Sequence, residues 1–396
     1  MEQACQVLVR FHEIALKGKN RPMFIKALVA NIRRATQGMD VERVWASHMV
    51  VRLTLATNAD WDAIRHRLAT VSGIAKFSLA YEVAHDFAAI QQQVLAIAAS
   101  RTFDSFRITA HRADKRFSLT SKELNIRLGD AVALKSRAKV DLRNPEVDIR
   151  VEVLPEGVFI HDQEEPGPGG LPVGTSGHIV TLMSGGIDSP VAAWRMVHRG
   201  CTTSLVHFHS FPLVEGRSRE KARELAEILT TYQYRTRLHL VPFAPLQQHL
   251  ILSIPGPLRI VVYRRFMLRI AEAIARKERA GMLVTGESLG QVGSQTLSNM
   301  TTIGEAVQMP LLRPLVGMDK QEIVAQAQTI GTYETSIMPD EDCCSLFVPR
   351  SPATRTYLKQ IRSLESGLDV AGLVDEAVAG TELVEFRTER ATANAS

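Results

Sequence analysis

The chain has 396 residues, of which 45% are hydrophobic and 22% charged, and its formal net charge is +5. This is the profile of a soluble globular protein long enough for about two or three domains. The sequence has no apolar run of about 18 residues, so we expect no membrane span. It also lacks a basic-then-apolar signal peptide at its start, and we expect a cytoplasmic protein.

The chain has four cysteines, Cys5, Cys201, Cys343 and Cys344. They form no C-x-x-C pair, and no Cys/His group has zinc spacing, so we expect no structural metal. So few cysteines, without disulfide-type spacing, fit a reducing compartment.

The first 165 residues alternate strand and helix patterns of an α+β fold. We predict two small modules here, at residues 1–60 and 61–165. The predicted strands are 7–11, 50–55, 76–82, 104–111, 147–153 and 157–160, and the predicted helices are 21–36, 87–100 and 121–134.

Basic residues gather in this part of the chain. Residues 101–143 contain eleven Lys or Arg against five Asp or Glu, a local excess of six positive charges. Cations beside Phe117 suit RNA, because cations meet phosphates and an aromatic ring stacks on a base. A solvated helix face and a basic loop are the alternatives. The candidate RNA-binding residues are Lys17, Lys19, Arg21, Arg112, Lys115, Arg116, Lys139 and Arg143.

The Gly- and Pro-rich stretch 166–177 predicts a linker or shaped loop. After it, strands and helices alternate over residues 178–396, which predicts a doubly wound parallel sheet. The predicted strands are 178–183, 203–209, 236–243 and 282–286, and the predicted helices are 190–199, 217–232 and 257–279.

The stretch Ser184-Gly185-Gly186-Ile187-Asp188-Ser189 lies between the first of these strands and its helix. Adjacent glycines allow a sharp turn and close approach of a ligand, and the helix N-terminus attracts phosphate. Asp188 would repel phosphate unless it holds Mg²⁺. No Lys follows the glycines, so this is not a Walker loop. An ordinary strand-to-helix turn is the alternative.

Other residues are predicted at the same edge of the sheet. Phe208 and His209 end the second strand and could contact adenine or ribose. One of Arg264 and Arg265 could face phosphates, since neighbours on a helix point about 100° apart. The loop 285–296, with Gly286 and Gln295, could bring backbone close to a substrate. The alternatives are a core Phe208 with a surface His209, surface charge for the two arginines, and an ordinary long turn for the loop.

Cys343 and Cys344 lie in a predicted loop. A reactive thiol needs a lowered pKa and exposure, and the neighbouring acidic residues 340–342 oppose that, so a cation such as Arg350 would have to compensate. Buried inert cysteines are the alternative.

The loop at 184–189 resembles that of the PP-loop ATP pyrophosphatases. Over nearly the whole length, the chain resembles the bacterial tRNA 4-thiouridine synthetases, or tRNA sulfurtransferases, of the ThiI family. The segments that carry this resemblance are Glu13–Arg21, Arg112–Phe117, Lys139–Pro145, Pro166–Asp188, His207–Ser210, Thr285–Thr296, Arg313–Glu322 and Asp342–Pro352. It implies a ferredoxin-like module, a THUMP RNA-binding domain and a PP-loop catalytic domain.

The resemblance implies that ATP and Mg²⁺ bind, that uridine 8 of tRNA is adenylated at O4, and that sulfur from a persulfide replaces that oxygen. It assigns catalysis to Asp188 and a cysteine, Cys344 rather than Cys343, and the metal to Asp188. The resemblance places ATP at residues 183–189. Together with the residues predicted at the same edge of the sheet, the candidate nucleotide contacts are Met183, Ser184, Gly185, Gly186, Asp188, Ser189, Phe208, His209, Arg264, Arg265, Gly286 and Gln295.

Longer family members carry a rhodanese domain with the persulfide cysteine, but no cysteine follows Cys344 here. The resemblance is therefore to short members, which take sulfur from a cysteine desulfurase or a separate rhodanese. The thiamin thiazole role depends on the rhodanese part, and we do not expect it here. Family members are often homodimers, which composition does not test.

Two other functions fit parts of the pattern. Another PP-loop enzyme that modifies tRNA or forms amides by adenylation would keep residues 184–189 but not the basic N-terminal part. A non-catalytic RNA-binding module would not need Asp188 or the loop 285–296.

Overall fold

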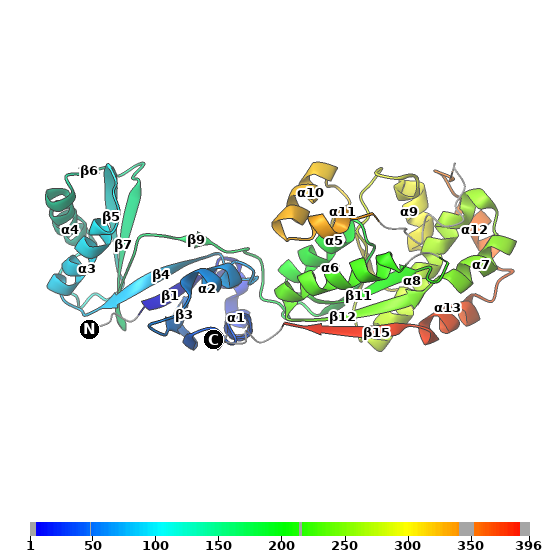
Figure 1. Ribbon diagram of the computed structural model, residues 1–396, viewed down its shortest axis with the longest axis horizontal. Helices are drawn as coiled ribbons and strands as arrows, with labels where there is room; N and C mark the ends of the chain where they lie inside the picture. Colours follow the sequence, from blue (N-terminus) through cyan, green and yellow to red (C-terminus); the bar gives the residue numbers. More distant parts are fainter. Residues whose placement is uncertain (1–4, 48, 214–215, 340–351, 389–396) are drawn as a thin grey trace. The chain divides into compact units, whose positions relative to one another are not determined.

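The computed structural model describes residues 5–388, apart from 48, 214–215 and 340–351 (Figure 1). The chain divides into two compact units, with the change between Leu171 and Pro172. In the described part of the chain, no helix combines the length and the apolar character needed to cross a bilayer.

The first unit begins with a four-stranded antiparallel arrangement and two helices. Strand β1 pairs with both β3 and β4, and β2 pairs with β3, which is the β-α-β-β-α-β order of a ferredoxin-like module. The elements are β1 (Cys5–Arg10), η1 (Glu13–Asn20), α1 (Arg21–Ala35), β2 (Val41–Ser47), β3 (Val50–Leu55), α2 (Trp61–Leu68) and β4 (Lys76–Val83).

A second module continues the same sheet. Strand β8 pairs with β4 through Tyr81 and Ile160, so one sheet runs in the order β2-β3-β1-β4-β8-β7-β5-β6. Helices α3 and α4 pack on its β5, β7 and β8 part. The elements are α3 (Phe87–Ala99), β5 (Ser105–Arg112), α4 (Ser121–Ser136), β6 (Lys139–Val140), β7 (Val147–Leu154), β8 (Gly157–His161) and β9 (Glu165–Pro166).

This pairing bears on the limit we predicted at residue 60. Strand β4 completes the first module because it lies beside β1, so the module needs residues up to Val83. Local sequence pattern did not reveal this, because β1 and β4 lie far apart in the sequence and meet only in the folded sheet. We therefore place the limit of the first module after β4.

The glycine-rich stretch 166–177 is hydrogen-bonded at both ends. The Gly167 N–H donates to the Ala75 carbonyl at 3.0 Å in the first unit, and the Gly174 N–H donates to the Gly200 carbonyl at 2.9 Å in the second. Gly169 and Gly170 both have positive φ, which explains the glycines. The stretch contains the boundary between the two units, and its hydrogen bonds give it the form of a shaped loop.

The second unit is built on a six-stranded sheet in the order β14-β13-β10-β11-β12-β15. Its neighbouring strands are parallel except for β15, which pairs antiparallel with β12. The predicted fold class is confirmed, with an antiparallel edge strand that the sequence analysis did not predict. The strands are β10 (His178–Leu182), β11 (Thr202–His209), β12 (Arg235–Pro242), β13 (Leu283–Val284), β14 (Leu311–Leu312) and β15 (Glu382–Arg387).

Helices cover both faces of this sheet (Figure 1). One apolar core joins a face of the sheet to α5, α6 and α10, and a second joins the opposite face to α7, α8, α12 and α13. The helices are α5 (Asp188–His198), α6 (Arg217–Gln233), α7 (Ala244–Ser253), α8 (Arg259–Lys277), α9 (Leu297–Gly304), α10 (Lys320–Thr329), α11 (Tyr333–Ile337), α12 (Leu358–Glu365) and α13 (Val370–Ala379). Two short 3-10 turns, η2 (Gly256–Leu258) and η3 (Gly293–Gln295), precede α8 and α9.

Two arginines of α8 hold α12 through one buried carboxylate. Glu365 accepts hydrogen bonds from Arg265 at 2.8 Å and from Arg269 at 2.7 Å, and Arg265 also pairs with Glu305 at 3.0 Å. Burial alone would raise the pKa of Glu365, but hydrogen bonds from Arg269 and Arg265 outweigh it and lower that pKa from 4.5 to about 2.

Because its pKa is depressed in the folded protein, Glu365 contributes stability above about pH 4.5 that is lost as the pH falls toward 2. Glu365→Ala leaves Arg265 buried without its main partner and should cost about 3–5 kcal/mol at neutral pH. Urea unfolding should show this loss shrinking as the pH drops below 4.5. Glu385→Ala, which removes an exposed carboxylate from Arg235 and Arg387, is the matched control and should have a much smaller effect. Equal losses in the two variants would contradict a role for burial.

Candidate functional site

The loop 183–189 lies at the carboxyl end of β10, at the centre of the second unit's sheet. β10 has β11 on one side and β13 on the other. The chain moves outward in one direction through β11 and β12 and then returns to the other side of β10 for β13 and β14. Such a switch point opens a crevice at the carboxyl ends of the strands, where doubly wound folds bind ligands.

The loop is closed by its own hydroxyl groups. Ser189 is buried, and its Oγ accepts the Ser184 N–H at 2.9 Å and lies 3.1 Å from the Ser184 carbonyl oxygen and from Ser184 Oγ. The Gly186 N–H donates to Ser184 Oγ at 3.3 Å. Helix α5 then begins at Asp188. Ser189, which we predicted as a nucleotide contact, therefore also fixes the shape of the loop.

Gly286 forms the opposite wall. A Cβ atom at this position would lie 2.8 Å from the Ser189 amide nitrogen and 2.9 Å from the Asp188 carbonyl carbon. Both are backbone atoms that cannot move aside without shifting the loop. The close approach of the two loops therefore requires a glycine at 286.

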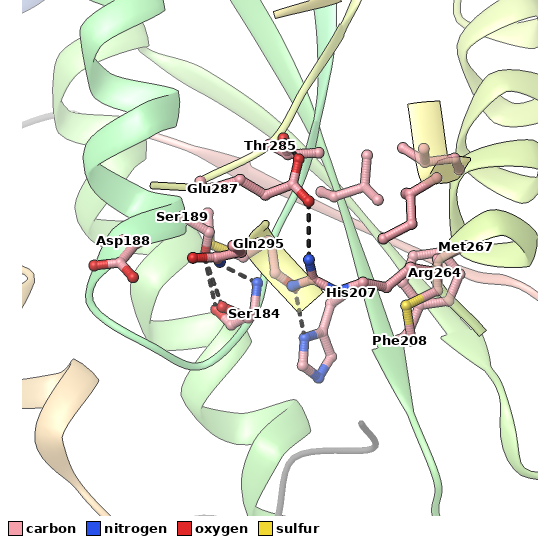
Figure 2. Close-up of a pocket in the computed structure, with 15 residues that line it drawn as sticks. Ser184, Asp188, Ser189, His207, Phe208, Arg264, Met267, Thr285, Glu287 and Gln295 are labelled. Atoms are coloured by element: carbon pink, nitrogen blue, oxygen red, sulfur yellow. Dashed lines mark hydrogen bonds and ion pairs between the residues drawn. The ribbon is translucent and has the colours of Figure 1, made fainter. Parts of the chain in front are cut away.

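A pocket opens between these loops and α8 (Figure 2). It measures about 870 Å³ when the space at its open mouth is included, within the usual range for small-molecule sites. Polar groups from the loops line one part and apolar side chains from β10, α8 and α9 line the other. The lining residues are Leu182, Met183, Ser184, Asp188, Ser189, His207, Phe208, Arg264, Met267, Leu268, Thr285, Gly286, Glu287, Gln295 and Ile303.

Asp188 is held by two side chains that the sequence analysis did not single out. Lys320 Nζ, at the start of α10, lies 2.6 Å from Asp188 Oδ1, and Gln291 Nε2 donates to Asp188 Oδ2 at 2.9 Å. They are 132 and 103 residues away in the sequence. Both belong to segments that support the family resemblance, which was the signal available to find them.

Glu287 is a second carboxylate at the pocket, and it is buried. Its Oε1 accepts from Arg264 Nη1 at 2.8 Å, and its Oε2 accepts from Arg313 Nε at 2.6 Å and from the Thr285 hydroxyl at 3.0 Å. Figure 2 shows the Arg264–Glu287 pair inside the pocket. Glu287 lies in the loop 285–296 that we predicted at this edge, but it is not among the residues predicted there.

The two neighbouring arginines have separate roles. Arg264 lines the pocket. Arg265 is 2% exposed, and its guanidinium is bound to Glu365, Glu305 and the Thr302 carbonyl. Arg265 is therefore not a pocket residue, and we remove it from the predicted nucleotide contacts. The reason is the angle of about 100° between successive residues of a helix.

The two residues predicted at the end of β11 also differ. Phe208 lines the pocket, as does its neighbour His207, whose Nδ1 lies 3.0 Å from the Met183 carbonyl oxygen. His209 is buried outside the lining. Burial, with help from Arg219 and His207, lowers the pKa of His209 to about 4, so it is neutral near pH 7. The predicted contact with adenine or ribose fails on position, because His209 lies outside the lining. We remove His209 from the predicted contacts.

Of the other predicted nucleotide contacts, Met183, Ser184, Gly286 and Gln295 line the pocket. Gly185 and Gly186 belong to the loop but are not among the residues that line the pocket. Cys343 and Cys344 lie outside the described residues, so their predicted roles stay predictions. Among the described residues, no group of three His, Cys, Asp or Glu side chains has metal-binding geometry.

All the residues predicted to bind RNA lie in the first unit. Lys17 and Lys19 are in η1, Arg21 begins α1, Arg112 ends β5, Lys115 and Arg116 follow it, and Lys139 and Arg143 are in and after β6. Some also hold the fold. Arg112 Nη1 donates to the Phe117 carbonyl at 2.9 Å, and Arg21 Nη2 donates to the Ala15 carbonyl at 2.8 Å. Lys19, Lys115, Lys139 and Arg143 are exposed.

Three family models match the chain in succession: a ThiI ferredoxin-like domain at residues 6–78, a THUMP domain at 84–161 and "Thiamine biosynthesis protein (ThiI)" at 174–370. A probable tRNA sulfurtransferase of Thermus thermophilus is 48% identical over 95% of this chain and 92% of its own length. The chain belongs to the ThiI family. The predicted resemblance is confirmed.

Other ThiI-family proteins agree with this assignment. A probable tRNA sulfurtransferase of Moorella thermoacetica is 42% identical over 97% of this chain and 98% of its own length. A crystal structure of a 4-thiouridine synthetase in complex with RNA and with bound ATP has a TM-score of 0.89 and 38% identity, and it covers 98% of this chain and 100% of the other. The likeness thus extends over both units.

Gly286→Ala should damage the site without unfolding the protein. The added methyl would push against the backbone of Asp188 and Ser189, and a shift of about 1 Å in such a loop costs about 100-fold in kcat/KM. Gly317→Ala is the matched control, because a Cβ there meets nothing within 4 Å. Steady-state turnover of ATP, calorimetric ATP titration and thermal melting of both variants would check this. ATP binding by Gly286→Ala as tight as that of Gly317→Ala would contradict the contact.

Proposed function

We propose that the chain is an ATP-dependent tRNA 4-thiouridine synthetase, which adenylates O4 of uridine 8 and replaces that oxygen with sulfur. The observation that carries the proposal is the pocket at the switch point, where the loop 183–189 and Asp188 face Lys320 and Arg264. Family membership adds RNA-binding modules to this nucleotide site.

The pocket offers ATP two kinds of surface. Backbone N–H groups of the loop and the start of α5 favour the phosphates. Phe208, Met267 and Ile303 offer an apolar wall for the adenine ring. Gln295 is 6% exposed, and its Oε1 has no hydrogen-bond partner among the described residues, so it can accept a bond from the nucleotide.

Asp188 suits a magnesium ion shared with phosphates. Mg²⁺ is usually held by one or two carboxylates together with phosphate oxygens and water, and a carboxylate has lone pairs beyond those that Lys320 and Gln291 use. The single half-buried carboxylate at the pocket therefore fits. When bound, the ion would neutralise charge that develops on the phosphates. Lys320 and Gln291 orient the carboxylate for that role.

Adenylation makes C4 of the uridine open to attack. The uridine O4 bonds to the α-phosphorus and pyrophosphate leaves. A persulfide sulfur then bonds to C4 while AMP leaves. The thiolate of Cys344 attacks the donor sulfur of the resulting disulfide, which frees 4-thiouridine and joins Cys344 to the donor cysteine until a thiol reductant separates them. A cysteine desulfurase or a separate rhodanese would supply the persulfide.

The exposed cations of the first unit would bind the tRNA backbone. Lys115, Lys139 and Arg143 are exposed in the THUMP domain, and Arg116 is exposed beside Asp114. Their contacts with phosphate would make binding weaken as salt rises. The homodimer that the resemblance implies stays a prediction.

Release of AMP and pyrophosphate from ATP should depend on unmodified tRNA. Asp188→Asn should lower that release on the order of 100-fold or more while tRNA binding stays intact, because the variant keeps the side chain's size and loses its charge. Chromatography of nucleotides and filter binding of tRNA would measure the two effects. AMP formed equally without tRNA would point to another PP-loop enzyme, and no AMP at all to a binding module.

Cys344→Ser should block 4-thiouridine formation in the presence of a desulfurase and cysteine, but not pyrophosphate release. A serine hydroxyl cannot attack the sulfur–sulfur bond, whereas adenylation does not need the thiol. Cys343→Ser is the control and should keep both steps. Full thiolation by Cys344→Ser, read from the absorbance of 4-thiouridine in the tRNA, would refute its role.

A further inference from the structure

Glu287 connects three elements at the wall of the pocket. It follows β13, whereas its partners Arg264 and Arg313 come from α8 and from the segment after β14. Its side chain is 6% exposed, and both carboxylate oxygens accept hydrogen bonds from guanidinium groups. A buried carboxylate needs such compensation, and two arginines give the trio a net positive charge beside the pocket.

Of the two arginines that bind Glu287, Arg264 lines the pocket and Arg313 does not. Arg264 lines it, and among the described residues its recorded hydrogen bond leaves from Nη1 alone. Nε and Nη2 are thus available to a ligand. Arg313 lies outside the lining and also donates from Nη2 to the Met300 carbonyl at 3.3 Å. Glu287 is therefore fixed from behind by Arg313 and Thr285 and holds Arg264 from that fixed position.

We propose that Glu287 is a positioning residue for adenylation, acting through Arg264 to aim its guanidinium at the triphosphate. The inference rests on the proposed function, since it takes ATP as the ligand. Without the carboxylate, the like charges of Arg264 and Arg313 would repel each other, and Arg264 would lose the partner that selects its conformation. A long flexible side chain positioned in advance binds phosphate at a lower entropic cost.

Glu287→Gln tests this at constant side-chain size. Its amide can accept from one arginine but presents N–H groups to the other. We expect ATP dissociation constants and KM to rise about 10–100-fold. Arg264→Gln should cause a similar loss, and the double variant should be no worse than Arg264→Gln alone, since Glu287 acts through that residue. Calorimetric titration measures the ATP dissociation constant without turnover. It therefore tests the role of Glu287 even if tRNA-dependent AMP formation is not observed and the proposed function fails.

Glu305→Gln is the matched control, because Glu305 also pairs with two arginines, Arg265 and Arg362, but lies outside the pocket. It should change stability and leave ATP binding unaltered. If Glu287→Gln does not fold, Arg313→Lys removes the Nε–H that bonds Glu287 while keeping the charge, and it should raise the ATP dissociation constant at least about threefold. Additive losses in the double variant, or lower melting temperature with unchanged ATP binding, would overturn the proposal.

Discussion

The pocket of the second unit depends on the contact between Gly286 and the backbone of Asp188 and Ser189. The two segments end neighbouring parallel strands, β13 and β10, on opposite sides of the point where the strand order reverses. A Cβ atom at 286 would lie only 2.8 Å from the Ser189 amide nitrogen and 2.9 Å from the Asp188 carbonyl carbon. The contact brings the loop that carries Asp188 within reach of Gln291 and leaves Glu287 and Gln295 at the pocket.

Charge is organised around two carboxylates at this pocket. Asp188 is half-buried and pairs with Lys320 and Gln291, whereas Glu287 is buried between Arg264 and Arg313. The first is placed to share a metal ion with phosphates, and the second can only act on the arginines that surround it. The same helix α8 sends Arg265 to the opposite side to hold α12 through Glu365, so one helix serves both the site and the fold.

In the first unit, strand β4 belongs to both modules of the sheet. β4 closes the ferredoxin-like module by pairing with β1 and begins the THUMP part of the sheet by pairing with β8. A continuous sheet makes the two modules a single body, so the basic residues near η1 and those near β5 and β6 are held on one framework. A framework of this kind suits a long polyanion, which is bound through several separated phosphate contacts.

The sequence alone determined the fold class, the loop 184–189, the family and most pocket residues, because these depend on local patterns: strand, glycine turn and helix in succession. It did not reveal Lys320, Gln291 or Glu287 as partners, since they meet Asp188, Arg264 and Arg313 only when distant segments fold together. Nor could it choose between Arg264 and Arg265 or remove His209. The choice between the arginines depends on which side of α8 faces the pocket, and that is decided by how the two faces of the sheet are covered, whereas His209 is excluded by its place at the very end of β11.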